Sequence, residues 1–301
     1  MASRELRISH RPELNRPVLV AAFRGWNDGG QGATLACGYL GRVWDAERFA
    51  DLDPEGFVDF QATRPQVSLD EGLTRHIEWP ENAFYHASIP GLDRDAILML
   101  GVEPNFRWRT FCDLSVGLAR DLGVELVVTL GALLADVPHT RPAPVTGSAS
   151  DPELVRRLGL QQSRYEGPTG IVGVLHDACR EAGLDSASLW AAVPHYVSLA
   201  PSPRAARAIV DRLGTLLGTE IDTAELVEAE ESYATQVSEA VASDAETAAY
   251  VEELERRADT IEEISEENIP SGDTLAAELT RFLRQHDREQ DDDEDEGPRE
   301  Q

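Results

Sequence analysis

The sequence predicts an α/β fold in which a mainly parallel sheet is sandwiched by helices. Three apolar runs, at residues 18–23, 96–100 and 124–130, have the length of strands that are buried on both faces, and each is followed closely by a glycine. Segments with apolar residues at helical spacing follow the first two runs. This alternation of strands and helices is typical of parallel sheets that are covered by helices.

Predicted strands and helices alternate along most of the chain. The predicted elements are strand 18–23, helix 31–43, strand 96–100, helix 106–121, strand 124–130, helix 171–182, strand 188–193 and helix 203–217. The helix at 106–121 joins two apolar strands and forms a crossover unit, which requires the two strands to be parallel. Residues 57–90 alternate apolar and polar side chains, notably at Phe57–Phe60 and Thr74–Trp79, and are interpreted as edge strands with one solvent-facing side.

The composition divides the chain into four segments. Residues 1–219 are predicted to form the α/β core, and residues 220–270 a long helix or, with a break near Ser243, a helical hairpin that acts as a lid or as an oligomerisation arm. Residues 271–286 are predicted to add a short helix. Residues 287–301 are predicted to be a disordered acidic tail, because eight carboxylates between 287 and 296 repel one another.

The charge distribution limits the classes of partner. The net charge is −28, and residues 220–301 hold 28 acidic and six basic side chains. Such a field repels phosphate backbones and anionic lipid, so neither nucleic acid nor a membrane is expected as a partner. All 27 basic residues are arginines, which excludes any lysine-dependent chemistry. No apolar stretch is long enough to span a membrane and no signal peptide is recognisable, so a cytoplasmic protein is predicted.

Neither the cysteines nor any recognisable motif in the sequence indicates a metal site or a cofactor. Cys37, Cys112 and Cys179 lie within apolar patterns and form no CxxC pair, so they are expected to be buried, reduced thiols. No metal-ligand spacing and no serine elbow is present. No cofactor and no metal site are therefore predicted.

The turn after the first strand is a candidate ligand site. Asn27, Asp28, Gly29 and Gly30 precede a predicted helix, and backbone N–H groups at a helix N-terminus bind anions. The glycine spacing matches neither a dinucleotide-binding loop nor a P-loop. The alternative is structural: the glycines permit a tight turn, and Asn27 or Asp28 caps the helix.

Four further loops contribute candidate residues. His139 and Arg141 lie between two prolines, which fix them either for ligand binding or for a structural contact. Tyr165, Glu166 and Thr169 precede a helix that Thr169 is placed to cap, and Glu166 is a candidate general base or one half of a buried ion pair. Glu103 flanks the helix at 106–121. The candidates of these loops are Glu103, His139, Arg141, Tyr165, Glu166, Thr169, His195 and Tyr196.

The carboxyl ends of parallel strands share one edge of a sheet, where ligands bind in open α/β proteins. Asn27, His139, Glu166 and His195 all follow or adjoin predicted elements at that edge, so they are candidates to converge in one pocket. A cluster of His, Glu and Arg suits acid–base chemistry on a nucleoside-like or phosphate-like molecule. A nucleophile is missing, which favours a non-enzymatic protein.

Five motifs together resemble the proteasome assembly chaperone family, in particular its actinobacterial members of the proteasome assembly chaperone 2 group. The motifs are Gly25–Gly30, Gly101–Trp108, Pro138–Pro142, Tyr165–Ile171 and Trp190–Tyr196, in the order and spacing of the family. The resemblance covers roughly residues 14–265. It implies a fold similar to that of purine nucleoside phosphorylases, with a smaller helical element, and an oligomeric protein.

The resemblance also implies a function in assembly and suggests no catalytic residue. Eukaryotic members pair with a partner chaperone to assemble the proteasome α-ring, and archaeal relatives that engage proteasomes use a C-terminal hydrophobic-Tyr-any-residue tail. This chain ends in Gly297-Pro298-Arg299-Glu300-Gln301, so docking by that tail is not expected. The leading hypothesis is a non-enzymatic, homo-oligomeric scaffold or assembly factor with a possible proteasome-related protein partner. The alternative is an enzyme or sensor for a nucleoside-like or phosphate-like ligand.

Overall fold

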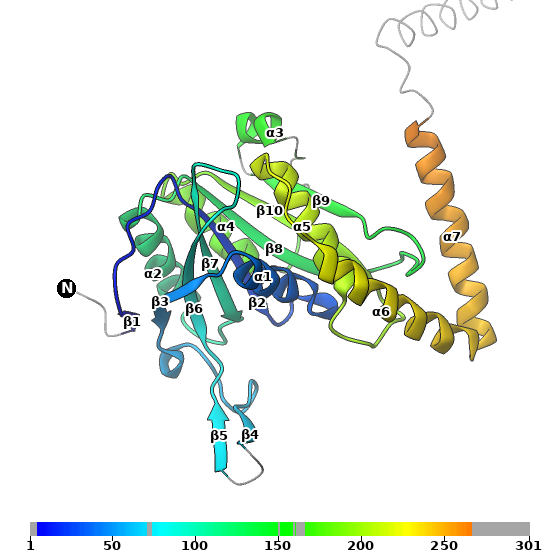
Figure 1. The fold of residues 1–301 in the computed structure, drawn as a ribbon, viewed down its shortest axis with the longest axis horizontal. Helices are drawn as coiled ribbons and strands as arrows, with labels where there is room; N and C mark the ends of the chain where they lie inside the picture. Colours follow the sequence, from blue (N-terminus) through cyan, green and yellow to red (C-terminus); the bar gives the residue numbers. More distant parts are fainter. Residues whose placement is uncertain (1–4, 71–73, 150, 159, 161–165, 267–301) are drawn as a thin grey trace, which may run out of the picture. The chain divides into compact units, whose positions relative to one another are not determined.

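The computed structural model describes residues 5–70, 74–149, 151–158, 160 and 166–266. It confirms the α/β fold: an eight-stranded sheet with the order β1-β3-β6-β7-β2-β8-β10-β9 carries helices on both faces (Figure 1). The strands of this sheet are β1 (Leu6–Ile8), β2 (Val18–Arg24), β3 (Glu47–Leu52), β6 (Asn82–Ser88), β7 (Asp95–Val102), β8 (Leu126–Ala135), β9 (Val145–Ala149) and β10 (Ser186–Pro194).

The centre of the sheet is parallel and both sides are antiparallel. Strands β7, β2, β8 and β10 run parallel to one another. The strands β6, β3 and β1 on one side, and β9 on the other, are antiparallel to their neighbours. The helices are α1 (Gly32–Val43), α2 (Trp108–Asp121), α3 (Pro152–Leu158), α4 (Ile171–Glu181), α5 (Pro203–Leu217), α6 (Ala224–Ala242) and α7 (Ala245–Glu266).

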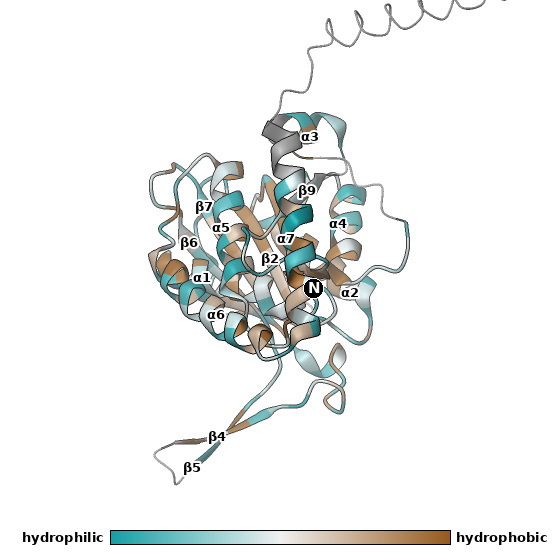
Figure 2. Cartoon of the chain, turned by 90° about the vertical axis from the view of Figure 1, so that its right-hand side faces the viewer, coloured by the Kyte–Doolittle hydropathy of each residue, from teal (hydrophilic) through white to brown (hydrophobic). Residues whose placement is uncertain are grey.

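The central strand β2 contributes side chains to the apolar clusters on both faces of the sheet. Val18, Val20 and Ala22 are buried against α1 and α5, whereas Leu19 and Phe23 are buried on the other face with α2 and α4. Successive side chains of a strand point to opposite faces, so a continuous apolar run fits a strand between two helical layers. Figure 2 accordingly colours much of the central strand β2 towards the hydrophobic end of the scale.

Helix α6 packs on α5 in the outer layer. Leu226 and Tyr233 are buried, and the Tyr233 hydroxyl donates a 3.2 Å hydrogen bond to the Leu199 carbonyl. Glu230 pairs with Arg207, whose Nη1 lies 3.0 Å from its Oε2. The chain forms two compact units that divide after Val251, so α6 belongs to the unit that carries the sheet. The helices α6 and α7 are separated at Ser243 and Asp244, where the sequence predicts a break.

Residues 57–90 match the prediction of edge strands only in part: Thr74–Glu78 form an antiparallel strand whose side chains are exposed from Arg75 onwards, but the other segments differ. Phe57–Phe60 form no strand, because Phe57 and Val58 are buried at the end of a short 3-10 turn, Pro54–Gly56. Strand β6 lies inside the sheet, between β3 and β7. Among the described residues, the strands β4 (Gln66–Asp70) and β5 (Thr74–Glu78) pair only with each other and form a separate two-stranded hairpin (Figure 1).

Other parts of the chain depart from the sequence prediction or lie outside the described residues. Strand β8 continues through Gly131 to Ala135 instead of ending at the glycine. The strands β1, β3 and β9 and the helix α3 are not among the predicted elements. The predicted short helix at 271–286 and the predicted acidic tail at 287–301 lie outside the described residues. None of the helices in the described ranges is long and apolar enough to cross a membrane.

Candidate functional site

A cavity of about 1520 Å³ opens beside the carboxyl end of β2, between α4 and the strands β8, β10 and β9. Its lining comes from five places in the sequence. The described residues that line it include Trp26, Asn27, Asp28, Leu133, Leu134, Thr146, Ser148, Thr169, His176, Asp177, Arg180, Ser188 and Trp190. One end of the cavity thus lies at the carboxyl edge of the sheet, where the sequence predicts a ligand site, and the rest extends along α4 and β10.

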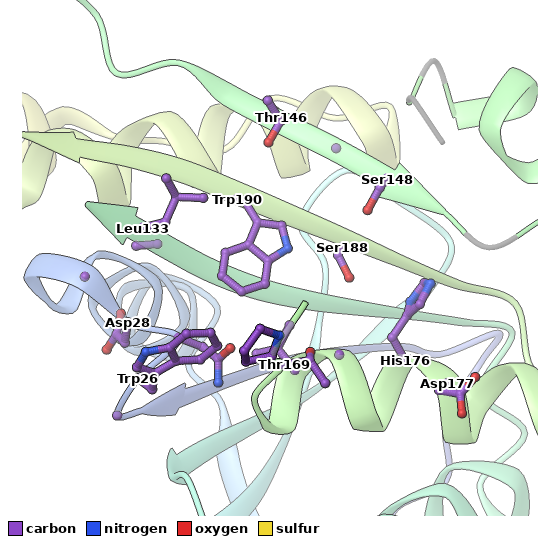
Figure 3. A pocket seen from close by; sticks show the side chains of 18 of the residues that line it. Trp26, Asp28, Leu133, Thr146, Ser148, Thr169, His176, Asp177, Ser188 and Trp190 are labelled. Carbon is purple, nitrogen blue, oxygen red and sulfur yellow. The ribbon is translucent and has the colours of Figure 1, made fainter. Parts of the chain in front are cut away.

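The strands supply a face of hydroxyl groups and one indole. Trp190 pairs in register with Thr146, and Ser188 with Ser148, so these four side chains share one face of the β9–β10 pair. The indole of Trp190 lies across Gly131, where an added Cβ would be 2.4 Å from its Cε3. Figure 3 shows these four side chains on the strand side of the cavity.

Helix α4 forms the opposite wall and contributes His176. Its Nδ1 is shielded from solvent and has no hydrogen-bond partner among the described residues. Burial lowers the pKa of His176 below its ordinary value of 6.5, since an imidazolium without partners is costly to desolvate. Figure 3 shows the ring extending from α4 towards the strand that carries Ser188. His176 therefore presents a neutral imidazole at neutral pH.

The charged groups at the rim of this wall pair with one another. Arg180 Nη2 lies 2.6 Å from Asp177 Oδ1 and 3.9 Å from Glu181 Oε1. The ion pair with Asp177 raises the pKa of Arg180. Arg180 is therefore paired with two carboxylates, so it does not offer an unpaired positive charge to a phosphate group.

Asp28 occupies the N-terminus of α1. Its Oδ1 accepts hydrogen bonds from the backbone N–H groups of Ala33, at 2.8 Å, and Thr34, at 3.3 Å, and the Thr34 hydroxyl donates to Oδ2. Burial raises the pKa of Asp28, and these hydrogen bonds oppose the rise. The structure thus favours the capping alternative: the anion at this helix end is the protein's own carboxylate.

Glu103 occupies the N-terminus of α4 in the same way. Its Oε1 accepts hydrogen bonds from the backbone N–H of Ile171 and from Nδ2 of Asn27, both at 2.9 Å. Its Oε2 accepts a 3.2 Å hydrogen bond from the Trp26 N–H. Glu103 therefore ties the end of β7 to the turn after β2 and to α4. Thr169 was expected to cap this helix, but its side chain makes no cap hydrogen bond and lines the cavity instead.

The glycines of the turn permit close packing. Gly30 adopts φ 56°, in the left-handed region that side chains disfavour. A Cβ on Gly29 would lie 3.2 Å from the Ala132 carbonyl oxygen. The carbonyl of Asn27 accepts a 2.9 Å hydrogen bond from the Ala132 N–H, which anchors the turn to β8. Asn27 is buried and is one of the residues that line the cavity.

His139 does not reach this cavity. It is buried in a second cluster, where its Nδ1 lies 2.8 Å from the Tyr196 hydroxyl and its Nε2 lies 3.1 Å from the Ser238 hydroxyl of α6. Its backbone N–H also donates to the Tyr196 hydroxyl, at 2.8 Å. His139 and Tyr196 thus join the loop after β8 to α6.

His195 belongs to the same second cluster. Its Nδ1 lies 3.2 Å from Asp136 Oδ1, and its ring meets those of Tyr196 and Tyr250 edge-on. Arg141 is near this cluster, and its carbonyl accepts a hydrogen bond from Arg204. The predicted convergence of Asn27, His139, Glu166 and His195 is therefore wrong, because β8 extends to Ala135 and carries the His139 loop past the cavity. Glu166 is exposed and does not line the cavity, and Tyr165 lies outside the described residues.

Sequence reasoning missed most of the polar lining of the cavity. Ser188 and Trp190 lie at alternate positions of one strand, opposite Ala187 and Leu189, and this period-two pattern was the available signal. His176 is one of several polar residues in an amphipathic helix, and nothing in the sequence distinguishes it from a polar residue on the solvent-facing side. Thr146 and Ser148 lie on β9, which was not predicted.

The cysteines are buried and unreactive, as expected. Cys37, Cys112 and Cys179 are free and buried. Burial raises the pKa of each thiol to about 12, so none is a thiolate at neutral pH.

Comparisons with known proteins place the chain in a family. The PAC2 family model matches residues 22–241. A PAC2 family protein from Streptomyces avermitilis is 50% identical over 78% of this chain and 99% of its own, with a TM-score of 0.72. A proteasome-assembly chaperone homologue from Mycobacterium tuberculosis is 47% identical over 78% of this chain and 99% of its own, with a TM-score of 0.71.

More distant structures share the fold. An archaeal proteasome activator from Pyrococcus furiosus, PbaB, is 19% identical over 79% of this chain and 99% of its own, with a TM-score of 0.64. No curated protein gives a significant match. The family model covers most of the described sheet and its helices, in agreement with the resemblance found in the five motifs. The chain therefore belongs to the PAC2 family.

Proposed function

We propose that this protein is a non-enzymatic assembly factor that acts as a homo-oligomer in the cytoplasm and engages proteasome-related proteins. The family and the 47% identical proteasome-assembly chaperone homologue support a chaperone-like role. The titratable side chains that suggested chemistry have structural partners instead: Asp28 and Glu103 close helix ends, and His139 holds α6. These contacts favour a scaffold over a catalyst.

The observation that carries the proposal is the apolar face of the β4–β5 hairpin. Val67 and Ile77 face each other in register, and Leu69 lies two residues along the same face. Their exposed fractions are 62%, 52% and 61% respectively. Exposed apolar side chains that gather on one face mark sites of protein interaction. Figure 2 shows brown, apolar segments alternating with teal ones on this hairpin, which extends away from the main sheet.

The occupant that we propose for this face is a second copy of the chain. The hairpin is a two-stranded sheet, so β4 and β5 each have one edge without a strand partner among the described residues. A hairpin alone is marginally stable in water, and a partner that covers its face and pairs its edge stabilises it. Two identical hairpins are complementary in both respects, which is the condition for an isologous interface.

Sedimentation equilibrium of the full chain tests this proposal. We expect a defined oligomer for the wild type and a monomer for the triple variant Val67→Ser, Leu69→Ser, Ile77→Ser. The matched control is Ser68→Ala with His76→Ala, a register pair on the opposite face of the hairpin, which keeps the oligomer. A monomeric wild type, or an oligomer that survives the triple substitution, would contradict the hairpin as the contact.

Binding to purified proteasome subunits tests the second half of the proposal. Residues 220–301 carry a strong excess of carboxylates, so a partner with a basic surface fits them. We expect the α- or β-subunits of the same organism to bind the oligomer, with an affinity that falls as salt rises. Absence of binding at low salt to either subunit would remove the proteasome as the partner.

The cavity favours a second function, the binding of an uncharged planar molecule. Its described lining combines two indoles, Trp26 and Trp190, with hydroxyl groups and the neutral imidazole of His176. Both helix N-termini beside it already hold a carboxylate, from Asp28 and Glu103, and Arg180 is paired. A flat heterocycle with hydroxyl groups, such as a nucleoside, fits this lining better than its phosphate.

A thermal-shift comparison of nucleosides with their monophosphates tests the second function. A ligand at about 100 times its dissociation constant adds about 2.7 kcal/mol to the free energy of unfolding. We expect a shift with a nucleoside, a smaller shift with its monophosphate, and loss of the shift in Ser188→Ala but not in Ser243→Ala. Equal shifts by both ligands, or none by either, would oppose this function without affecting the assembly role.

A further inference from the structure

Three side chains that could hold a metal ion meet on the antiparallel side of the sheet. The ligand atoms of His10, Glu47 and His86 all lie within 4.8 Å of one another. His10 follows β1, Glu47 opens β3 and His86 lies on β6, so no short motif links them in the sequence. Glu47 and His86 are paired in register across β3 and β6, and the backbone holds them together.

The spacing of the two imidazoles is that of a tetrahedral metal site. His10 Nε2 lies 3.4 Å from His86 Nε2. Two nitrogens that each bind one tetrahedral Zn²⁺ at about 2.0–2.1 Å lie about 3.3–3.4 Å apart. Glu47 Oε2 lies 4.0 Å from His86 Nε2, and its side chain is 76% exposed. A small rotation of that free side chain brings its oxygen within reach of the same ion.

The surroundings of His10 fix the tautomer that binds a metal. The Ser9 hydroxyl donates its single proton to the Phe49 carbonyl, at 2.9 Å. The same hydroxyl oxygen lies 3.3 Å from His10 Nδ1, so it accepts a hydrogen bond from Nδ1–H. The lone pair of the neutral ring is then on Nε2, which faces His86. A hydrogen bond from the second nitrogen to a neighbouring group is the usual support of a metal-binding histidine.

The rings are also held by packing. Phe49 is fully buried beneath the cluster, and the ring centroids of His10 and His86 lie 6.4 Å and 5.9 Å from its own. His86 retains 23% of its exposure, so an ion has access from solvent. The cluster is therefore both ordered and reachable.

We propose that His10, Glu47 and His86 bind a divalent transition metal ion, with Zn²⁺ as the ion to test. Two imidazoles and one carboxylate suit this class of ion, and a fourth position remains for water or for another ligand. The ion joins the segment after the edge strand β1 to β3 and β6. Its first effect is thus to fasten the N-terminal strand to the sheet.

Competition of the full chain with a chromophoric chelator for Zn²⁺ measures the site. Excess Mg²⁺ in the buffer occupies the carboxylates of the acidic C-terminal third, which prefer hard ions. We expect one tight Zn²⁺ per chain in the wild type. His10→Ala and His86→Ala each weaken it by more than about 100-fold, because loss of a direct ligand exceeds the 10- to 100-fold cost of losing an outer partner. Ser9→Ala weakens it by about 10-fold.

The control is His76→Ala, an exposed histidine on β5 that lies outside the cluster and leaves the affinity unchanged. Circular dichroism of each metal-free variant verifies that it has folded. Substitution by Co²⁺ gives a second readout: a tetrahedral site produces intense visible bands, which disappear in His86→Ala. The absence of tight Zn²⁺ binding in the wild type, or undiminished binding in the double variant of His10 and His86, would overturn the proposal.

Discussion

The side-chain amide of Asn27 donates a 2.9 Å hydrogen bond to Oε1 of Glu103, the same oxygen that accepts the backbone N–H of Ile171. One carboxylate thus joins the turn after β2, the end of β7 and the first residue of α4. Glu103 is half-buried, and its carboxylate also accepts the backbone N–H of Trp26. All three of these donors require an acceptor. Two partners of Glu103, Trp26 and Asn27, line the cavity.

Glu103→Gln should destabilise the protein by about 1–3 kcal/mol, because a glutamine has only one acceptor oxygen and places an N–H group against one of the donors. Urea denaturation at neutral pH measures the difference. Glu13→Gln, at an exposed position, is the control and should change the free energy of unfolding by less than about 0.5 kcal/mol. A Glu103→Gln variant as stable as this control would show that the junction is dispensable.

Gly170→Ala should disrupt the same junction sterically. A Cβ at Gly170 would lie 2.1 Å from Asn27 Nδ2, so the amide must move away from Glu103. We expect a loss of about 1–3 kcal/mol in the free energy of unfolding. Gly117→Ala, inside α2 with no atom within 4 Å of the added Cβ, should instead stabilise by about 0.5–1 kcal/mol. If both substitutions changed the free energy of unfolding in the same direction, the packing described at Gly170 would be contradicted.

The titration of Asp28 should appear in the pH dependence of stability. Burial raises its pKa in the folded state above the ordinary value of 3.8. Between these two pKa values the folded chain holds a proton that the unfolded chain has lost, so this contribution to stability falls as the pH rises. Asp28→Asn keeps the cap and removes the titration. Relative to this variant, the wild type should lose stability as the pH increases above 3.8, and parallel pH profiles would refute the shift.

His176 should act on stability in the opposite sense. Burial lowers its pKa in the folded state below 6.5, so just below that pH the unfolded chain binds a proton that the folded chain does not. Stability therefore falls as the pH is lowered through 6.5. His176→Gln, which does not titrate, should lack this fall. Denaturation profiles of both proteins between neutral and mildly acidic pH provide the comparison, and identical profiles would show that His176 is not desolvated.

The parallel centre of the fold was predictable because its signal is local. The run Val18–Phe23 is apolar at every position and has the length of a strand, which is typical of a strand between two helical layers. The outer strands are harder to predict: β1 has three residues, and three of the six residues of β3 are charged, so neither has a strong hydrophobic period. Phe57 was assigned to a strand because its neighbours alternate, but its burial comes from packing at a turn.

The candidate site was predictable only in part. Its place at the carboxyl edge of the sheet and its Asn27 turn followed from the topology. The roles of the charged residues did not, since the sequence does not reveal that Asp28 and Glu103 satisfy helix ends of the protein itself. His139 and His195 were misplaced because the length of β8 beyond Gly131 is set by its pairing with β10, a contact between residues far apart in the chain.

The most direct test of the proposed assembly role is the rate at which purified proteasome α- and β-subunits form complete particles with and without this protein, followed by native gel electrophoresis. We predict that the wild type accelerates assembly and that the Val67→Ser, Leu69→Ser, Ile77→Ser variant, folded but monomeric, does not. The Ser68→Ala, His76→Ala control should retain the acceleration. An assembly rate that the wild-type oligomer leaves unchanged would contradict the proposed function.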